Sequence, residues 1–106
     1  MPGLALNGVS ILGSFSIACP ADVSCTASAV ALTAPTVGIG ANGVEEIFLQ
    51  ADSGNTADIL VGDSARQTIH IAAGFSLTIP LRDPSKLYVK SASGTQTLHI
   101  LYRGQP

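Results

Sequence analysis

The stretch IFLQADSGNTADILVGDSA (residues 47–65) alternates apolar and polar residues, breaks at Ser53-Gly54-Asn55, and then alternates again. A period of two is typical of β-strands with one buried face, and Ser, Gly and Asn are common turn residues. The pattern therefore predicts two strands joined as a hairpin. Together with Glu46, which directly precedes it, the stretch holds four of the seven acidic residues and no basic one. These acids raise three interpretations: a metal site, a catalytic loop, or one plain hairpin of a β-scaffold, which we favour.

The same alternation recurs along most of the chain, and turn-type residues interrupt it about every ten residues, as in sandwiches and barrels. We therefore predict an all-β fold, an antiparallel β-sandwich of about eight strands that is jelly-roll-like. An immunoglobulin-like sandwich is the alternative, and the alanine-rich segment 28–34 could instead form a short helix. The expected strands lie at residues 9–17, 28–34, 46–51, 58–62, 68–72, 75–79, 86–92 and 97–102.

The length of 106 residues suits one domain with one modest core. We expect an N-terminal arm at residues 1–8, a single sandwich domain at residues 9–103 and a frayed C-terminal tail at residues 104–106. The N-terminal segment lacks the basic start of a signal peptide, and no apolar run approaches the roughly 18 residues that span a membrane. We therefore predict no membrane association, and synthesis in the cytoplasm.

Charged residues make up only 11% of the chain, whereas about a quarter is usual. A free monomer normally carries more charge to stay soluble, so we expect part of the exterior to be buried against copies of the chain or another protein. Residues 1–65 carry six acids and no Lys or Arg, and residues 66–106 carry five bases and one acid. The two halves pair either inside the domain or between neighbouring subunits. Five scattered bases predict no nucleic-acid binding.

Oxygen-bearing side chains could suggest a calcium site, but their spacing does not fit the EF-hand loop, which places ligands at alternate positions and closes with Glu. Asp52 and Asn55 are better explained by bonds to the backbone of a turn. We predict no metal and no cofactor. The side chains that could suggest such a calcium site are those of Asp52, Asn55, Asp58 and Asp63.

Gly62-Asp63-Ser64 is similar to the nucleophile block of GDSL-type esterases. That chemistry needs a histidine base oriented by a third group, and neither His70 nor His99 has the usual aspartate three residues before it. We therefore predict that the protein is not an enzyme. Both histidines are expected on the wetter faces of their sheets as ordinary cross-strand residues.

The two cysteines, Cys19 and Cys25, lie in the segment CPADVSC. In one extended strand they would lie roughly 20 Å apart, beyond the reach of a disulfide. Pro20 and Asp22 instead favour a turn that could bring them together. A disulfide and two unpaired thiols therefore both remain open, whereas two cysteines alone make only half of a zinc site.

Tyr102 alternates in phase with apolar neighbours and is expected in the core. Tyr88 alternates out of phase with Leu87 and Val89, so we predict that it is a surface or interface anchor. Arginine is common in protein interfaces, and an extended arm can add to the edge of a sheet. The other candidate interface residues are Leu4, Leu6, Arg66 and Arg82.

Residues 47–102 contain a series of turn-and-strand motifs: Asn55-Thr56, Ile59, Val61-Gly62-Asp63, Ala73-Gly74-Phe75-Ser76, Ser85-Lys86-Leu87-Tyr88-Val89, Ser93-Gly94-Thr95 and Leu101-Tyr102. In these motifs the segment resembles a module of small structural proteins of tailed bacteriophages. Leu60 stands where the module usually has an aromatic residue, and Phe75-Ser76 replaces Glu-Ser. The resemblance does not extend to residues 1–46.

The resemblance implies a virion structural protein, most simply a capsid decoration (cement) protein on the outer surface of the phage head. Such proteins bind the major capsid protein, are often homotrimers, and stabilise the shell by bridging its subunits. A tail or fibre component, or a receptor-binding module that recognises carbohydrate, is the alternative function. A carbohydrate site usually needs exposed aromatic residues, and this chain has five aromatic residues and no Trp.

Overall fold

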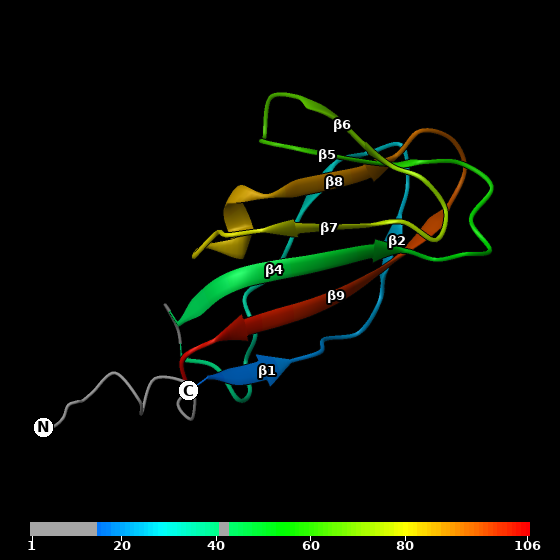
Figure 1. Ribbon diagram of the computed structural model, residues 1–106. Helices are drawn as coiled ribbons and strands as arrows, with labels where there is room; N and C mark the ends of the chain where they lie inside the picture. Colours follow the sequence, from blue (N-terminus) through cyan, green and yellow to red (C-terminus); the bar gives the residue numbers. More distant parts are fainter. Residues whose placement is uncertain (1–14, 41–42) are drawn as a thin grey trace, which may run out of the picture.

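The structure is a computed structural model that describes residues 15–40 and 43–106, and the predicted arm with Leu4 and Leu6 lies outside these residues. Figure 1 shows an all-β chain. The described residues form one short 3₁₀ turn, η2 (Pro84–Lys86), and nine strands: β1 (Ser16–Ala18), β2 (Val23–Cys25), β3 (Val30–Ala31), β4 (Val44–Ala51), β5 (Ile59–Gly62), β6 (Gln67–Ile71), β7 (Ser76–Ile79), β8 (Tyr88–Ser91) and β9 (Gln96–Gly104).

The strands form two antiparallel sheets. Sheet A has the order β1-β9-β4-β7, with β2 also paired to β9, and sheet B has the order β3-β8-β5-β6. Apolar side chains from the inner faces of both sheets meet in one core, because alternate residues of each strand point to the same side. Among them are Ile47 and Leu49 of β4 and Ile59 and Val61 of β5. The predicted antiparallel β-sandwich is confirmed.

β1 and β2 lie end to end along the same side of β9. Ala18 pairs with Tyr102, and Val23 pairs with Leu98. The four residues between Ala18 and Val23 thus lie opposite only three on β9, which places one extra residue in the break, as in a β-bulge. Pro20, which cannot donate to a ladder, lies inside this break, where an edge strand tolerates it.

When β1 and β2 are counted as one broken strand, the described residues form eight strands in a nested pairing. The first strand pairs with the last, β3 with β8, β4 with β7, and β5 with β6. This nested order is consistent with the predicted jelly-roll-like connectivity, in which an eight-stranded antiparallel ribbon is rolled into two sheets.

The predicted hairpin in residues 47–65 is wrong. β4 pairs with β7 and β9 in sheet A, whereas β5 pairs with β6 and β8 in sheet B. The Ser53-Gly54-Asn55 turn is part of a crossover between the two sheets, which Figure 1 shows at the end of the sandwich where β4 finishes.

Polar side chains attach this crossover to β9. The Asn55 side chain donates from Nδ2 to the Thr97 carbonyl (2.9 Å) and accepts from the Thr97 amide at Oδ1 (2.9 Å), as a neighbouring strand would. The Gln96 side chain accepts from the Thr56 amide (2.9 Å) and donates to the Ser93 carbonyl (2.9 Å). Because a buried amide must be paired, these contacts explain why Gln96 is tolerated at 5% exposure.

Tyr102 is confirmed as a core residue. It is 1% exposed, and its hydroxyl donates to the Thr33 carbonyl (2.6 Å). Burial raises the pKa of this phenol to about 12. The neighbouring position on β1 is Ala18, and a small side chain fits beside the large ring.

Of the strand predicted at residues 9–17, the structure describes residues 15–17, and Ile17 does not face the core. Ile17 is 66% exposed, whereas Ala18 packs against the core. Strand β2 was not predicted. The chain end also differs, because the Gln105 amide donates to the Gly43 carbonyl (2.8 Å) and its carbonyl accepts from Gly40 (2.9 Å), so the end is attached to its neighbours.

Candidate binding surface

The outer face of sheet A carries apolar side chains across three adjacent strands. Ile17 of β1, Leu101 of β9 and Phe48 of β4 lie on this face; Phe48 pairs with Leu101, and Ile17 pairs with Arg103, two residues further along β9. They border a shallow hollow of about 230 Å³. We call this surface the sheet A patch, and its residues are Ile17, Glu46, Phe48, Thr78, Leu101 and Arg103.

The two charges of the sheet A patch neutralise each other. Arg103 donates from Nε to Glu46 Oε1 (3.2 Å), and its guanidinium lies 4.6 Å from the centroid of the Phe15 ring. A half-exposed pair of this kind adds little stability, and the cation–π contact further occupies the guanidinium. The sheet A patch is therefore apolar in character although it contains an acid and a base.

A second hollow, of about 420 Å³, lies along the edge of the sandwich beside β1. Ile17 borders both hollows, and Val37 on the opposite side is 78% exposed. Gly38 adopts a positive φ of 86°, a conformation that favours glycine, where the chain turns past β1. The residues of this edge hollow are Ile17–Pro20 and Pro35–Gly38.

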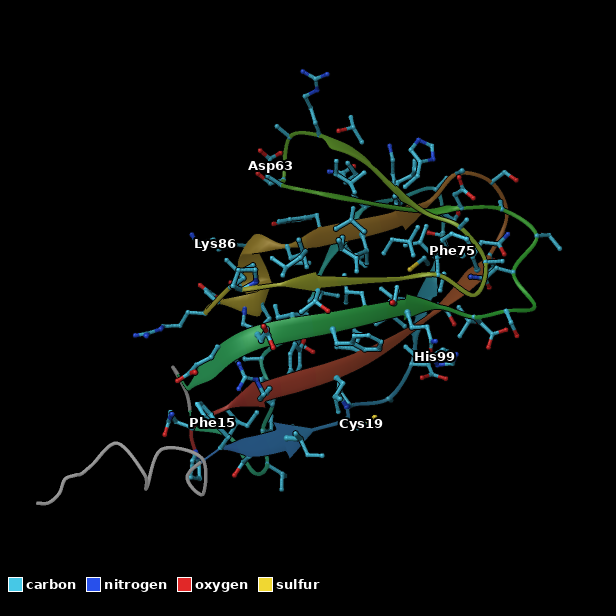
Figure 2. The ribbon with its side chains drawn as sticks, viewed as in Figure 1. Phe15, Cys19, Asp63, Phe75, Lys86 and His99 are labelled. Carbon is cyan, nitrogen blue, oxygen red and sulfur yellow. The ribbon has the colours of Figure 1, made fainter. Side chains whose placement is uncertain are left out.

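His99 lies on the same outer face, two residues before Leu101 on β9. Its Nδ1 is 2.8 Å from Asp22 Oδ1, and its Nε2 is 2.9 Å from Asp52 Oδ1. The hydrogen bond to Asp22, followed by that to Asp52, raises the pKa of His99 above its ordinary value of 6.5. The bonds to His99 and to the Gly54 amide lower the pKa of Asp52. Figure 2 shows His99 on β9, with Cys19 just beyond β1 and Phe15 at its start.

The predicted interface residues lie elsewhere. Tyr88 is half-buried and belongs to β8 of sheet B, where it pairs with Gly62, and both Arg66 and Arg82 are exposed in connections between strands. These three residues do not contribute to the sheet A patch. Tyr88 instead borders a hollow of about 510 Å³ together with Ala31, Asp63, Ser64, Ser85 and Lys86.

The acidic residues considered as calcium ligands have separate partners. Asp63 accepts from the Ala65 and Arg66 amides (2.9 and 2.8 Å), and Asp58 bonds to His70 (2.9 Å). In the part of the chain that the structure describes, no three His, Cys, Asp or Glu side chains form a group that could hold a metal ion. Around His99 the two carboxylates bind opposite nitrogens of the ring, so their oxygens do not converge on one point.

The GDSL-like block lies in the exposed turn between β5 and β6, where the Asp63 carboxylate caps the turn and Ser64 is exposed. Both histidines bond to carboxylates, His70 to Asp58 and His99 to Asp22 and Asp52. The exposed side chain of His70 agrees with its predicted position on the wetter face of its sheet.

The disulfide between Cys19 and Cys25 is not formed. Cys19 is an exposed free thiol and Cys25 a buried one, because they lie six residues apart along the broken edge strand and Pro20 does not turn the chain back. Burial raises the pKa of Cys25 to about 11.

Sequence reasoning missed the sheet A patch, although Phe48 carried a signal. It alternates with Ile47 and Leu49 and shares its phase with Gln50, a pattern that places an aromatic residue on the outer face of the strand. Ile17 gives no such signal, because it shares its phase with the apolar Phe15 and alternates with Ser16.

No protein-family model, curated protein or solved structure matches this chain. Among the described residues, no helix is long and apolar enough to cross a membrane.

Proposed function

We propose that this protein is a virion structural protein that decorates the outside of a phage head and docks on the major capsid protein through the sheet A patch. The observation that carries the proposal is the apolar surface formed by Ile17, Leu101 and Phe48 on three adjacent strands. A contiguous exposed apolar surface is a common sign of a protein-binding site.

The composition supports a docked chain. Only 11% of residues are charged, and the two charges in the sheet A patch are paired with each other. Burying the patch therefore leaves no isolated charge without water, which is the main cost that a docking surface must avoid. The partner that fits this chemistry is a protein surface with projecting apolar side chains.

The resemblance of residues 47–102 to small phage structural proteins supports the major capsid protein as this partner. A decoration protein that contacts two capsid subunits stabilises the assembled shell by mass action, because it binds only the assembled state. We further propose a homotrimer located on the capsid surface, with Leu4 and Leu6 of the N-terminal arm as additional contacts. The mass of the purified protein in solution tests the trimer.

The experiment compares the occupancy of wild-type and variant chains on expanded shells of the capsid protein encoded in the same genome. Ile17→Asp places a charge at the most exposed apolar residue of the sheet A patch, and we expect a loss of about 2 kcal/mol or more, or about thirtyfold in affinity. Phe75→Asp is the matched control, because Phe75 is equally exposed, at 69% against 66%, and lies far from Phe15 and β1 in Figure 2.

Equal occupancy of wild type and Ile17→Asp would contradict docking through this surface, and no binding of the wild type to shells would contradict decoration. Copy number distinguishes a head decoration protein from a tail component, because the former is present in hundreds of copies per particle and the latter in a handful. Removal of residues 1–8 is expected to lower occupancy if the arm contributes.

A second candidate function is carbohydrate binding at the hollow of about 510 Å³ on sheet B. The observation that favours it is a half-buried Tyr88 next to polar groups of Asp63, Ser64 and Lys86, because a sugar stacks on an aromatic ring and bonds to polar side chains around it. A glycan array with wild-type and Tyr88→Ala chains tests this function, and binding that is lost in the variant would support it.

A further inference from the structure

The geometry around His99 favours its protonated form. Both ring nitrogens lie within 2.9 Å of a carboxylate oxygen, and an ionised carboxylate can only accept a hydrogen bond. Both nitrogens must therefore donate, and only the imidazolium carries a proton on each. A neutral ring keeps one of the two bonds at most and turns a lone pair toward the other carboxylate.

The two carboxylates come from segments of different kinds. Asp52 directly follows β4, accepts a second bond from the Gly54 amide (2.9 Å), and precedes the crossover that Asn55 holds against β9. Asp22 lies in the break between β1 and β2, where residues 19–22 have no ladder partner on β9. Of the side-chain hydrogen bonds in the described part of the chain, Asp22 takes part only in the bond to His99.

The break that Asp22 ends lies beside the proposed docking surface. Cys19 and Pro20 border the edge hollow together with Ile17, which is shared with the sheet A patch. The bond between Asp22 and His99 therefore ties one side of the edge hollow to β9, next to the apolar residues that we propose for docking.

The other elements around His99 bring no competing charge. On β4 its ladder partner is Gln50, and the next residue across, on β7, is Ser76. The β1–β2 break contributes Asp22 and the Cys19 thiol, and the β4–β5 crossover contributes Asp52. The nearest charged residues along the same face, Arg103 and Glu46, are paired with each other.

We propose that protonated His99 is a pH-operated latch that holds residues 19–22 against β9 and thereby fixes the edge hollow beside the sheet A patch. When His99 loses its proton, Asp52 keeps its hydrogen bond from the Gly54 amide. Asp22 has no other side-chain hydrogen bond within residues 15–40 and 43–106, so residues 19–22 are released from β9. The structural part of this proposal is independent of the proposed function, whereas the consequence for docking rests on the proposed function.

The structural part is tested by NMR on the full chain between pH 5 and 9. We expect the amide signals of Cys19, Ala21 and Asp22 to shift with the same midpoint as the His99 ring, and the order parameters of these residues to fall above it. Asp22→Asn is expected to lower the midpoint of His99, whereas the matched control Asp58→Asn, which alters the contact of His70, leaves it unchanged.

An unchanged His99 midpoint in Asp22→Asn, or residues 19–22 that do not respond to the titration, would overturn the latch. The consequence for docking is tested by shell occupancy across the same pH range, where wild type is expected to lose occupancy above the midpoint and His99→Gln to show no such step. An identical pH profile for both chains would overturn the regulation. Because the NMR titration needs no shells, failure to bind shells at every pH would contradict the proposed function alone.

Discussion

The outer faces of the two sheets differ although their inner faces are alike. Both sheets bury alternate apolar residues in one core. On the outside, sheet A presents Ile17, Leu101 and Phe48 side by side, whereas sheet B presents Leu60 between His70 and Lys90, which are its ladder neighbours.

The charges follow the same division. The four ion pairs of the described residues each join an acid from residues 1–65 to a base or histidine from residues 66–106, which supports pairing inside the domain. Within the described residues, four bases form no ion pair and are therefore free for water or for a neighbouring subunit: Arg66, Arg82, Lys86 and Lys90. The charged groups beside the sheet A patch are thus paired with one another, whereas Lys90 on the outer face of sheet B is not.

The largest expected effect is on the free energy of unfolding, and it distinguishes the inner face of β4 from the outer face. Leu49→Ala removes a side chain with 0% exposure and is expected to lower the free energy of unfolding by about 2–5 kcal/mol. Phe48→Ala on the outer face is expected to cost less, because its ring is already partly exposed, while it weakens shell binding. Urea denaturation of both variants checks this, and equal losses would show that Phe48 is part of the core.

A smaller loss is expected from the crossover between the sheets. Asn55→Ala removes two hydrogen bonds to Thr97. We expect a loss of about 1–3 kcal/mol because the Thr97 amide loses its acceptor, whereas the Thr97 carbonyl still accepts from the Asp52 amide (3.1 Å). Asn55→Asp keeps the acceptor and loses the donor, so its stability is expected to lie between those of wild type and Asn55→Ala. Thermal unfolding measures both, and a wild-type stability in Asn55→Ala would contradict the role of the crossover contacts.

The strands were predictable from the sequence because alternation is a local property. The segments expected at 46–51, 58–62, 68–72, 75–79 and 97–102 overlap β4, β5, β6, β7 and β9. Their pairing was not predictable, since the partner of a strand depends on contacts far away in the chain. The polar crossover around Asn55 has the composition of a hairpin turn, and only its bonds to residues 96 and 97 distinguish the two.

The candidate site was predictable only in part. The orientation of β1 is set by the fit of Ala18 beside Tyr102, which involves residues 84 positions apart, and β2 is too short for a period to appear. The interface residues proposed from the sequence that the structure describes, Tyr88, Arg66 and Arg82, were chosen for residue type, whereas the sheet A patch arises from neighbours on three strands.

A pH effect on stability is expected from His99. The pKa of His99 is raised in the folded chain, so its contribution to the free energy of unfolding is complete below pH 6.5. This contribution is lost as the pH rises through the raised pKa. The pKa of Asp52 is lowered, so its contribution is present above 3.8 and is lost as the pH falls through the lowered value. Melting temperatures are therefore expected to be highest between these limits, and His99→Gln is expected to flatten the profile more than His70→Gln.

The smallest effect concerns the two thiols. Cys19 is exposed and Cys25 is buried with its pKa raised to about 11, so an aromatic disulfide reagent is expected to modify one thiol per folded chain. Both thiols are expected to react in denaturant without reductant. A denatured chain in which neither reacts would reveal a disulfide and contradict the extended edge strand.

The most direct measurement for the account as a whole is a cryo-electron microscopy map of the chain bound to expanded shells. We predict that Ile17, Leu101 and Phe48 lie within about 4 Å of capsid residues and that Leu60 and Lys90 face the solvent. A map in which sheet B lies on the shell and the sheet A patch faces the solvent would contradict the account.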